Sequence, residues 1–209
     1  VSYTVEQIVS TSPVVPVIVV DNVDHAAPLA QALHNGGLKV LEITLRTPVA
    51  LEAMKKMKEA VPDAIVGAGT IVTPADVERA VAAGADFLVS PGTSPDMIDA
   101  VLAAGIPMLP GISTPSEAMN LKARGFNVLK FFPAEAAGGV PMLKSIGGPL
   151  ADLRFCPTGG INLAKAPEYL SLPNVVCVGG TWMLPKDLIE KQDWKAIENL
   201  AREAAELAR

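Results

Sequence analysis

The sequence predicts a single (β/α)8 TIM barrel that occupies residues 1–209 as one domain, with a short N-terminal helix and a C-terminal helix added to it. Eight short apolar runs, rich in β-branched residues, alternate with amphipathic segments along the whole chain. This strict alternation implies a parallel sheet with right-handed crossovers. A chain of 209 residues suits one domain with one core. Eight such units also fit the compact end of the size range of these barrels, roughly 200 residues.

The predicted elements follow one another without a visible linker. The strands are Val14 to Val20, Leu38 to Thr44, Ala64 to Ala68, Asp86 to Val89, Met108 to Leu109, Asn127 to Phe131, Arg154 to Thr158 and Val175 to Val178. The helices between them are Asp24 to His34, Pro48 to Val61, Pro74 to Ala83, Pro95 to Ala104, Pro115 to Arg124, Gly139 to Ile146 and Leu163 to Leu170. Val5 to Val9 predicts a short helix that covers the bottom of the barrel, and Trp194 to Leu207 predicts a final packed helix.

Capping residues mark where the predicted helices begin and end. Four hydroxyl–proline pairs place a side-chain oxygen at the N-cap and proline at the first helical position: Thr47-Pro48, Thr73-Pro74, Ser94-Pro95 and Thr114-Pro115. Four glycines are expected to close helices: Gly36, Gly84, Gly105 and Gly125. An open doubly wound sheet is the alternative arrangement. The barrel is favoured because no Gly-x-Gly-x-x-Gly motif follows the first strand and no strand is obviously an edge.

Bulk composition limits the partners that the chain can have. A net charge of −5 without a basic stripe argues against general nucleic-acid binding. The longest apolar run, Pro13 to Val20, is far shorter than the roughly 20 residues of a membrane span. The amino terminus lacks the basic stretch and apolar run of a secretory signal. We therefore expect a cytoplasmic protein that binds neither nucleic acid nor membrane.

The few cysteines and histidines indicate neither disulfides nor a metal centre. Cys156 and Cys177 have no paired spacing and lie in apolar segments, so we interpret both as core residues. His25 and His34 fall in the first predicted helix, and no carboxylate–histidine cluster has the spacing of metal ligands. No metal and no cofactor is expected.

Two predicted strands carry charged side chains toward the barrel interior. Side chains alternate across a strand, so Glu42, Thr44 and Arg46 share one face of the second strand while the apolar residues share the other. Because the apolar face must meet the helices, a carboxylate and a guanidinium are placed inside; an exposed ion pair on an edge strand is the alternative. Lys130, on the sixth strand, is expected to be buried, where apolar surroundings and a nearby cation favour an uncharged, nucleophilic amine. A structural salt bridge is the alternative for Lys130.

The loops after the predicted strands favour an anionic substrate. The last two strands end in Thr158-Gly159-Gly160 and in Gly179-Gly180-Thr181. Glycine lets a backbone approach a ligand closely, and barrel enzymes often bind phosphate with these two loops. Thr70 is placed to hydrogen-bond a substrate carboxylate, and the loop that contains Pro91 keeps the mouth open and contributes a candidate substrate-binding residue.

Together these motifs resemble the 2-keto-3-deoxy-6-phosphogluconate (KDPG) aldolases, which also include 4-hydroxy-2-oxoglutarate (KHG) aldolases, over nearly the whole chain. The similar segments are Val14 to Val17, Leu41 to Thr47, Gly67 to Thr70, Pro110 to Thr114, Lys130 to Glu135 and Arg154 to Ile161. The resemblance implies a metal-independent class I aldolase of the Entner–Doudoroff pathway. Such an enzyme splits KDPG into pyruvate and glyceraldehyde 3-phosphate, and many members also cleave KHG. It further implies a homotrimer.

The resemblance also implies a role for each matched residue. Lys130 would be the Schiff-base lysine and Glu42 the general acid/base. Arg46 and Thr70 would hold the pyruvate carboxylate, with Thr158 lining the site. Gly159, Gly160, Gly180 and Thr181 would bind the phosphate. Thr181 departs from the serine expected there but keeps the hydroxyl.

Other functions stay open on these residues. One is an aldolase for the epimeric substrate, 2-dehydro-3-deoxy-6-phosphogalactonate. A barrel isomerase or synthase acting on a ribose phosphate would use the same phosphate loops without a reactive lysine. A non-catalytic sugar-phosphate sensor would bind the ligand without turnover. Substrate turnover and a covalently trapped lysine separate these alternatives.

Overall fold

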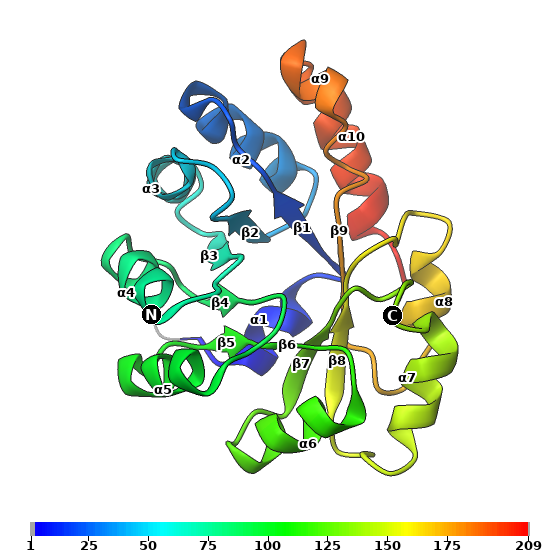
Figure 1. The fold of residues 1–209 in the computed structure, drawn as a ribbon. Helices are drawn as coiled ribbons and strands as arrows, with labels where there is room; N and C mark the ends of the chain where they lie inside the picture. Colours follow the sequence, from blue (N-terminus) through cyan, green and yellow to red (C-terminus); the bar gives the residue numbers. More distant parts are fainter. Residues whose placement is uncertain (1–2, 209) are drawn as a thin grey trace.

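The computed structural model describes residues 3–208 as an α/β fold whose parallel strands curl inside a layer of helices (Figure 1). The strands are β1 (Val14–Ile18), β2 (Val40–Thr44), β3 (Ile65–Gly69), β4 (Leu88–Val89), β5 (Met108–Leu109), β6 (Gly111–Ile112), β7 (Val128–Phe131), β8 (Arg154–Pro157) and β9 (Val178–Gly180). The helices are α1 (Val5–Thr11), α2 (Ala26–Asn35), α3 (Ala50–Ala60), α4 (Pro74–Ala82), α5 (Pro95–Ala104), α6 (Pro115–Ala123), α7 (Gly139–Gly147), α8 (Ala166–Leu170), α9 (Lys186–Glu190) and α10 (Trp194–Ala205), with a 3-10 turn at Val23–His25 before α2.

The strands form two parallel sheets. One has the order β5-β4-β3-β2-β1-β9, and the other has the order β6-β7-β8. β5 and β6 are the two halves of one extended segment, divided at Pro110, which has no N–H to donate. The carbonyl of Pro110 still accepts a hydrogen bond from Lys130 N at 2.9 Å. The predicted alternation of helices with a parallel sheet is therefore confirmed, and the fifth strand continues further than the predicted Met108 to Leu109.

Several predicted boundaries were wrong for local reasons. β4 begins at Leu88 rather than Asp86, because the Asp86 carboxylate instead accepts a hydrogen bond from Val66 N at 2.9 Å. β9 begins at Val178, and Val175 makes only an isolated parallel bridge to Phe155. The predicted helix from Asp24 splits into the 3-10 turn and α2. Helix α9 was not predicted.

Three of the four predicted N-caps are confirmed. Thr73, Ser94 and Thr114 accept hydrogen bonds from backbone N–H groups at the starts of α4, α5 and α6, and proline follows each of them. Thr47 was wrongly predicted as a cap: α3 begins only at Ala50, and the Thr47 hydroxyl donates instead to Val20 O at 2.6 Å. That hydrogen bond ties the end of β2 to the segment after β1.

Two apolar clusters hold the fold together. The larger lies between the strands and the outer helices. The smaller includes Ile8 and Val9 of α1, packed against the other face of the strands. Helix α1 thus covers one end of the strands, as predicted (Figure 1). Cys156 and Cys177 are buried in this smaller cluster, which confirms their interpretation as core residues. Among the described helices, none is long and apolar enough to cross a membrane.

Candidate active site

Lys130 and Glu42 meet in the interior of the strands. Lys130 lies on β7 and Glu42 on β2, and their side chains are only 6% and 4% exposed. Lys130 Nζ lies 3.5 Å from Glu42 Oε1. That oxygen is buried and has no hydrogen-bond partner among the described residues. A fully buried lysine is rare. Because Glu42 Oε1 accepts no other hydrogen bond from the described residues, it can exchange a proton with Lys130 Nζ.

Two residues beside the pair, Phe132 and Gly69, contact it closely or leave space for it. Phe132 places its ring centroid 5.3 Å from Lys130 Nζ, within the range of a cation–π contact. On β3, a Cβ added to Gly69 would lie 2.2 Å from Glu42 Oε1. Only glycine at this position leaves room for the carboxylate in its present place. Gly69 is the register partner of Thr44, so the Glu42 side chain extends along its strand to lie against Gly69.

Arg46 and Thr70 stand together at the carboxyl end of β2 and β3. Arg46 Nε donates to Thr70 Oγ1 at 3.1 Å. Thr70 has a φ of 61°, a left-handed conformation that is uncommon for a residue other than glycine and often marks a functional site. The expectation that Arg46 points into the interior was wrong: β2 ends at Thr44, and Arg46 lies exposed beyond it. The pair therefore lies at the mouth, where an anion can reach both groups.

Thr158 follows β8 and Pro91 follows β4, so they lie at the carboxyl ends of two strands that are not paired with each other. Thr158 is 7% exposed, and its N–H donates to Phe131 O at 2.9 Å. A Cβ at Gly179 would lie 2.3 Å from Thr158 Oγ1, so the hydroxyl fills the space that glycine leaves. Pro91 is half-buried, and a Cβ added to Gly111 would lie only 2.4 Å from the Pro91 carbonyl carbon.

The two predicted phosphate loops offer unpaired backbone donors. Gly159 and Gly160 have φ values of 110° and 76°, which glycine adopts without strain. Within residues 3–208, the backbone N–H groups of Gly160 and Thr181 make no hydrogen bond, whereas Gly159 lies next to the parallel bridge between Thr158 and Gly179. A Cβ at Gly180 would lie 2.0 Å from the ring of Trp182, so this loop is also tightly packed. Free N–H groups in such turns form the kind of concavity that binds phosphate.

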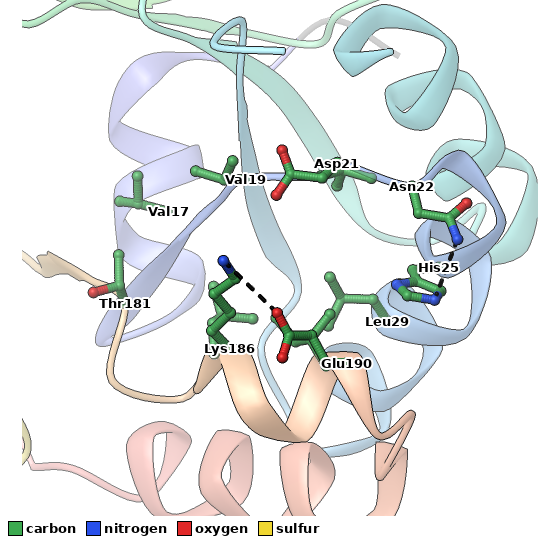
Figure 2. Close-up of a pocket in the computed structure, with 12 residues that line it drawn as sticks. Val17, Val19, Asp21, Asn22, His25, Leu29, Thr181, Lys186 and Glu190 are labelled. Atoms are coloured by element: carbon green, nitrogen blue, oxygen red, sulfur yellow. Dashed lines mark hydrogen bonds and ion pairs between the residues drawn. The ribbon is translucent and has the colours of Figure 1, made fainter. Parts of the chain in front are cut away.

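A cavity of about 560 Å³ lies beside the loop that contains Thr181 (Figure 2). Thr181 lines it together with Val17, Asp21 and Lys186. Glu42 and Lys130 are not among its lining residues, although Val17 is the register partner of Glu42. The cavity therefore touches the Thr181 loop, and neither member of the charged pair lines it.

No local pattern in the sequence indicates the cluster around Glu135, the last residue of the Lys130 to Glu135 motif. Tyr169 donates to Glu135, and Lys165 forms an ion pair with the same carboxylate. The hydrogen bond from Lys165, followed by that from Tyr169, holds the pKa of Glu135 below its ordinary value. Burial, and then the bond to Glu135, raise the pKa of Tyr169. Contacts between residues 30 or more positions apart leave no local signal in a sequence.

Neither histidine approaches the charged pair. His25 makes an edge contact with Trp194, and His34 lies 3.0 Å from Asp63. Among the residues that the structure describes, no group of three or more histidine, cysteine, aspartate or glutamate side chains is placed to hold a metal ion.

Comparison with known proteins gives one consistent result. The family model described as KDPG and KHG aldolase matches residues 5–200. The 2-dehydro-3-deoxy-phosphogluconate aldolase of Dickeya dadantii is 51% identical over 95% of this chain and 93% of its own length. The KHG/KDPG aldolase of Escherichia coli K12 is 49% identical over 98% and 96%. The crystal structure of KDPG aldolase from Legionella pneumophila, which holds pyruvate as a covalent carbinolamine intermediate, is 46% identical, covers 96% of this chain and 97% of its own, and has a TM-score of 0.93.

Proposed function

The chain belongs to the KDPG and KHG aldolase family, and on this premise we propose that it is a class I aldolase, a carbon–carbon lyase. Its main reaction cleaves 2-dehydro-3-deoxy-6-phosphogluconate to pyruvate and glyceraldehyde 3-phosphate in the Entner–Doudoroff pathway. It also cleaves 4-hydroxy-2-oxoglutarate to pyruvate and glyoxylate, an activity named in the E. coli relative. Relatives about half identical over nearly the whole chain support both substrates.

The observation that carries this proposal is the buried pair of Lys130 and Glu42, with 3.5 Å between Nζ and Oε1. Transfer of one proton from the ammonium to Glu42 leaves a free amine, whose lone pair adds to the C2 carbonyl carbon of the substrate. Glu42 then returns its proton to the C2 hydroxyl of the resulting carbinolamine, which leaves as water and gives an iminium beside an ionised Glu42. The related Legionella enzyme holds pyruvate at the carbinolamine stage.

The iminium then acts as the electron sink for cleavage. The C4 hydroxyl loses its proton to Glu42, directly or through one water, as the C3–C4 bond breaks. The bonding electrons move into an enamine, and the aldehyde departs. Protonation at C3 and hydrolysis of the imine release pyruvate and restore the amine of Lys130. Each step needs one acid/base group beside the imine, and Glu42 is the carboxylate in that position.

The mouth of the site would orient the substrate at both ends. Arg46 and Thr70 bind the carboxylate next to C2, because a guanidinium and a hydroxyl already stand together there. Thr158 and Pro91 line the space between. The phosphate binds at Gly159, Gly160, Gly180 and Thr181: Gly160 and Thr181 offer free N–H groups, and Gly159 and Gly180 allow close approach of the backbone.

We also infer the larger organisation of the protein. A closed (β/α)8 barrel forming one domain over residues 1–209 is supported by the bridges Phe155–Val175 and Thr158–Gly179, which join β8 to the segment of β9, and by the continuation of β5 into β6. From the family we expect a homotrimer located in the cytoplasm. We expect it to need no metal or cofactor and to bind neither nucleic acid nor membrane.

The test is a side-by-side assay of pyruvate release from KDPG, its phosphogalactonate epimer and 4-hydroxy-2-oxoglutarate, after chelation and gel filtration. Release from KDPG and 4-hydroxy-2-oxoglutarate without added metal is expected. A preference for the galactonate would move the assignment to the epimeric substrate. Release from none of the three would contradict the aldolase function.

A further inference from the structure

The loop that follows the Lys130 strand carries a carboxylate that the aldol reaction does not use. Glu135 lies after β7, and both of its oxygens are occupied. Tyr169 Oη donates to Oε1, and Lys165 Nζ pairs with Oε2. Tyr169 is a buried residue of α8, only 1% exposed, and Lys165 is the residue that immediately precedes α8. The loop after β7 is therefore attached to the start of the helix after β8.

This carboxylate is ionised around neutral pH, and its bond to Tyr169 has a fixed direction. The Lys165 hydrogen bond lowers the pKa of Glu135, so the group remains an acceptor. Burial raises the pKa of Tyr169, so the phenol keeps its proton and remains a donor. A charge-assisted hydrogen bond of this kind is stronger than a neutral one. The partly buried hydrogen bond from Tyr169 therefore holds Glu135 more strongly than the exposed ion pair with Lys165 would alone.

Glu135 also packs directly against the turn that we assign to phosphate. A Cβ at Gly160 would lie 2.7 Å from Glu135 Cγ and 2.9 Å from its Cβ. Glu135 N donates to Gly159 O at 3.1 Å, and Ala134 N donates to Thr158 O at 2.8 Å. The backbone and the side chain of one segment therefore hold one side of the turn. The N–H group of Gly160 makes no hydrogen bond within the described part of the chain.

We propose that Glu135, held by Tyr169 and Lys165, is a positioning residue that fixes the Gly159-Gly160 turn for phosphate binding. The same residue fixes the distance between that turn and the strand that carries Lys130. Lys165 has a second effect, since its ammonium offsets a carboxylate that would otherwise repel a phosphate dianion. The inference rests on the proposed function, because it needs the turn to be the phosphate site.

A positioning role and a purely structural role of Glu135 predict different effects on phosphorylated and unphosphorylated substrates. A bond that only stabilises the fold would change the turnover of phosphorylated and unphosphorylated substrates alike. A bond that positions the phosphate turn should raise KM for KDPG and leave 4-hydroxy-2-oxoglutarate, which has no phosphate, nearly unchanged. It should also weaken competitive inhibition by inorganic phosphate.

The experiment measures kcat and KM on both substrates for Glu135→Gln and Tyr169→Phe. Glu135→Gln keeps the size of the side chain but removes the charge. It should raise KM for KDPG and Ki for inorganic phosphate by roughly ten-fold, the scale of one charge-assisted hydrogen bond. For 4-hydroxy-2-oxoglutarate, kcat/KM should stay within about two-fold of wild type, which is less than a hydrogen bond contributes. Tyr169→Phe should change KM in the same direction by less.

Glu198→Gln is the matched control, because Glu198 also accepts from two cations, Lys195 and Arg202, but does so on α10 and touches neither loop. It should leave KM for both substrates unchanged. Equal losses on both substrates, or an unchanged KM for KDPG in Glu135→Gln, would overturn the positioning role. A wild-type protein that cleaves neither substrate would instead overturn the proposed function.

Discussion

The two ends of the site are built in different ways. The chemical end consists of two side chains, Lys130 and Glu42, that are buried on strands and packed on all sides. The phosphate end consists of backbone N–H groups in turns, with Gly160 and Thr181 exposed. Side chains on strands fix the reacting atoms, whereas turns present donors to a part of the substrate that does not react. Damage to the first end should therefore lower kcat, and damage to the second should raise KM.

The largest effect should come from Lys130. Lys130→Ala removes the amine that β7 holds beside Glu42, so kcat should fall by roughly 10⁴-fold or more, as when other covalent nucleophiles are removed. Lys130→Arg should restore nothing, because the guanidinium stays protonated and cannot form an imine. Steady-state assays, with circular dichroism to confirm folding, check this. Near-normal turnover in either variant would show that another group does the chemistry.

Glu42→Gln should cause the second-largest loss of kcat. The amide keeps the shape of the side chain but cannot exchange the proton, so kcat should fall by roughly 10²–10⁴-fold, the usual contribution of a general acid/base. KM for KDPG should change little, because Glu42 does not touch the predicted carboxylate or phosphate donors. A rise in KM with kcat preserved would mean that Glu42 binds the substrate rather than moving a proton.

Gly69→Ala should reproduce part of this loss without replacing a charged residue. The new Cβ would lie 2.2 Å from Glu42 Oε1, so the carboxylate must move away from Lys130. A displacement of about 1 Å at reacting groups costs up to roughly 10²-fold in rate. Gly148→Ala is the control, because its Cβ would meet no atom closer than 3.8 Å. Wild-type kcat in Gly69→Ala would show that the position of Glu42 is not critical.

Gly160→Ala tests the phosphate end and should have the smallest effect on kcat. Its φ of 76° disfavours a side chain, and the Cβ would lie 2.7 Å from Glu135 Cγ, so the turn must shift. KM for KDPG should rise by roughly ten-fold, since one or two N–H donors lose their alignment. The parameters for 4-hydroxy-2-oxoglutarate should stay near wild type.

Gly84→Ala separates backbone strain from binding. Gly84 has a similar φ of 83°, and its Cβ would meet nothing within 4 Å. This variant should lose about 1–2 kcal/mol of stability from the left-handed backbone and keep both KM values. If Gly160→Ala damages the two substrates equally, the turn shapes the fold rather than the phosphate site.

The same contrast explains what could be predicted from the sequence. Periodicity indicated that Glu42 and Lys130 lie on strands and face inward, because a period of two is a local signal. The caps at Thr73 and Thr114 were also local. Arg46 was misplaced because no pattern shows that β2 stops at Thr44. Contacts such as Thr47 to Val20 and Tyr169 to Glu135 join distant segments, and the fold alone brings them together.

The central claim is that Lys130 forms the Schiff base. The direct measurement is incubation with pyruvate and borohydride, followed by mass spectrometry of the intact protein and its peptides. The account predicts one reduced pyruvoyl group per chain, on Lys130 and on no other lysine. It also predicts that the exposed Lys39 and Lys144 stay unmodified, because neither lies beside a buried carboxylate. Trapping on a different lysine, or no trapping in an active enzyme, would contradict the account.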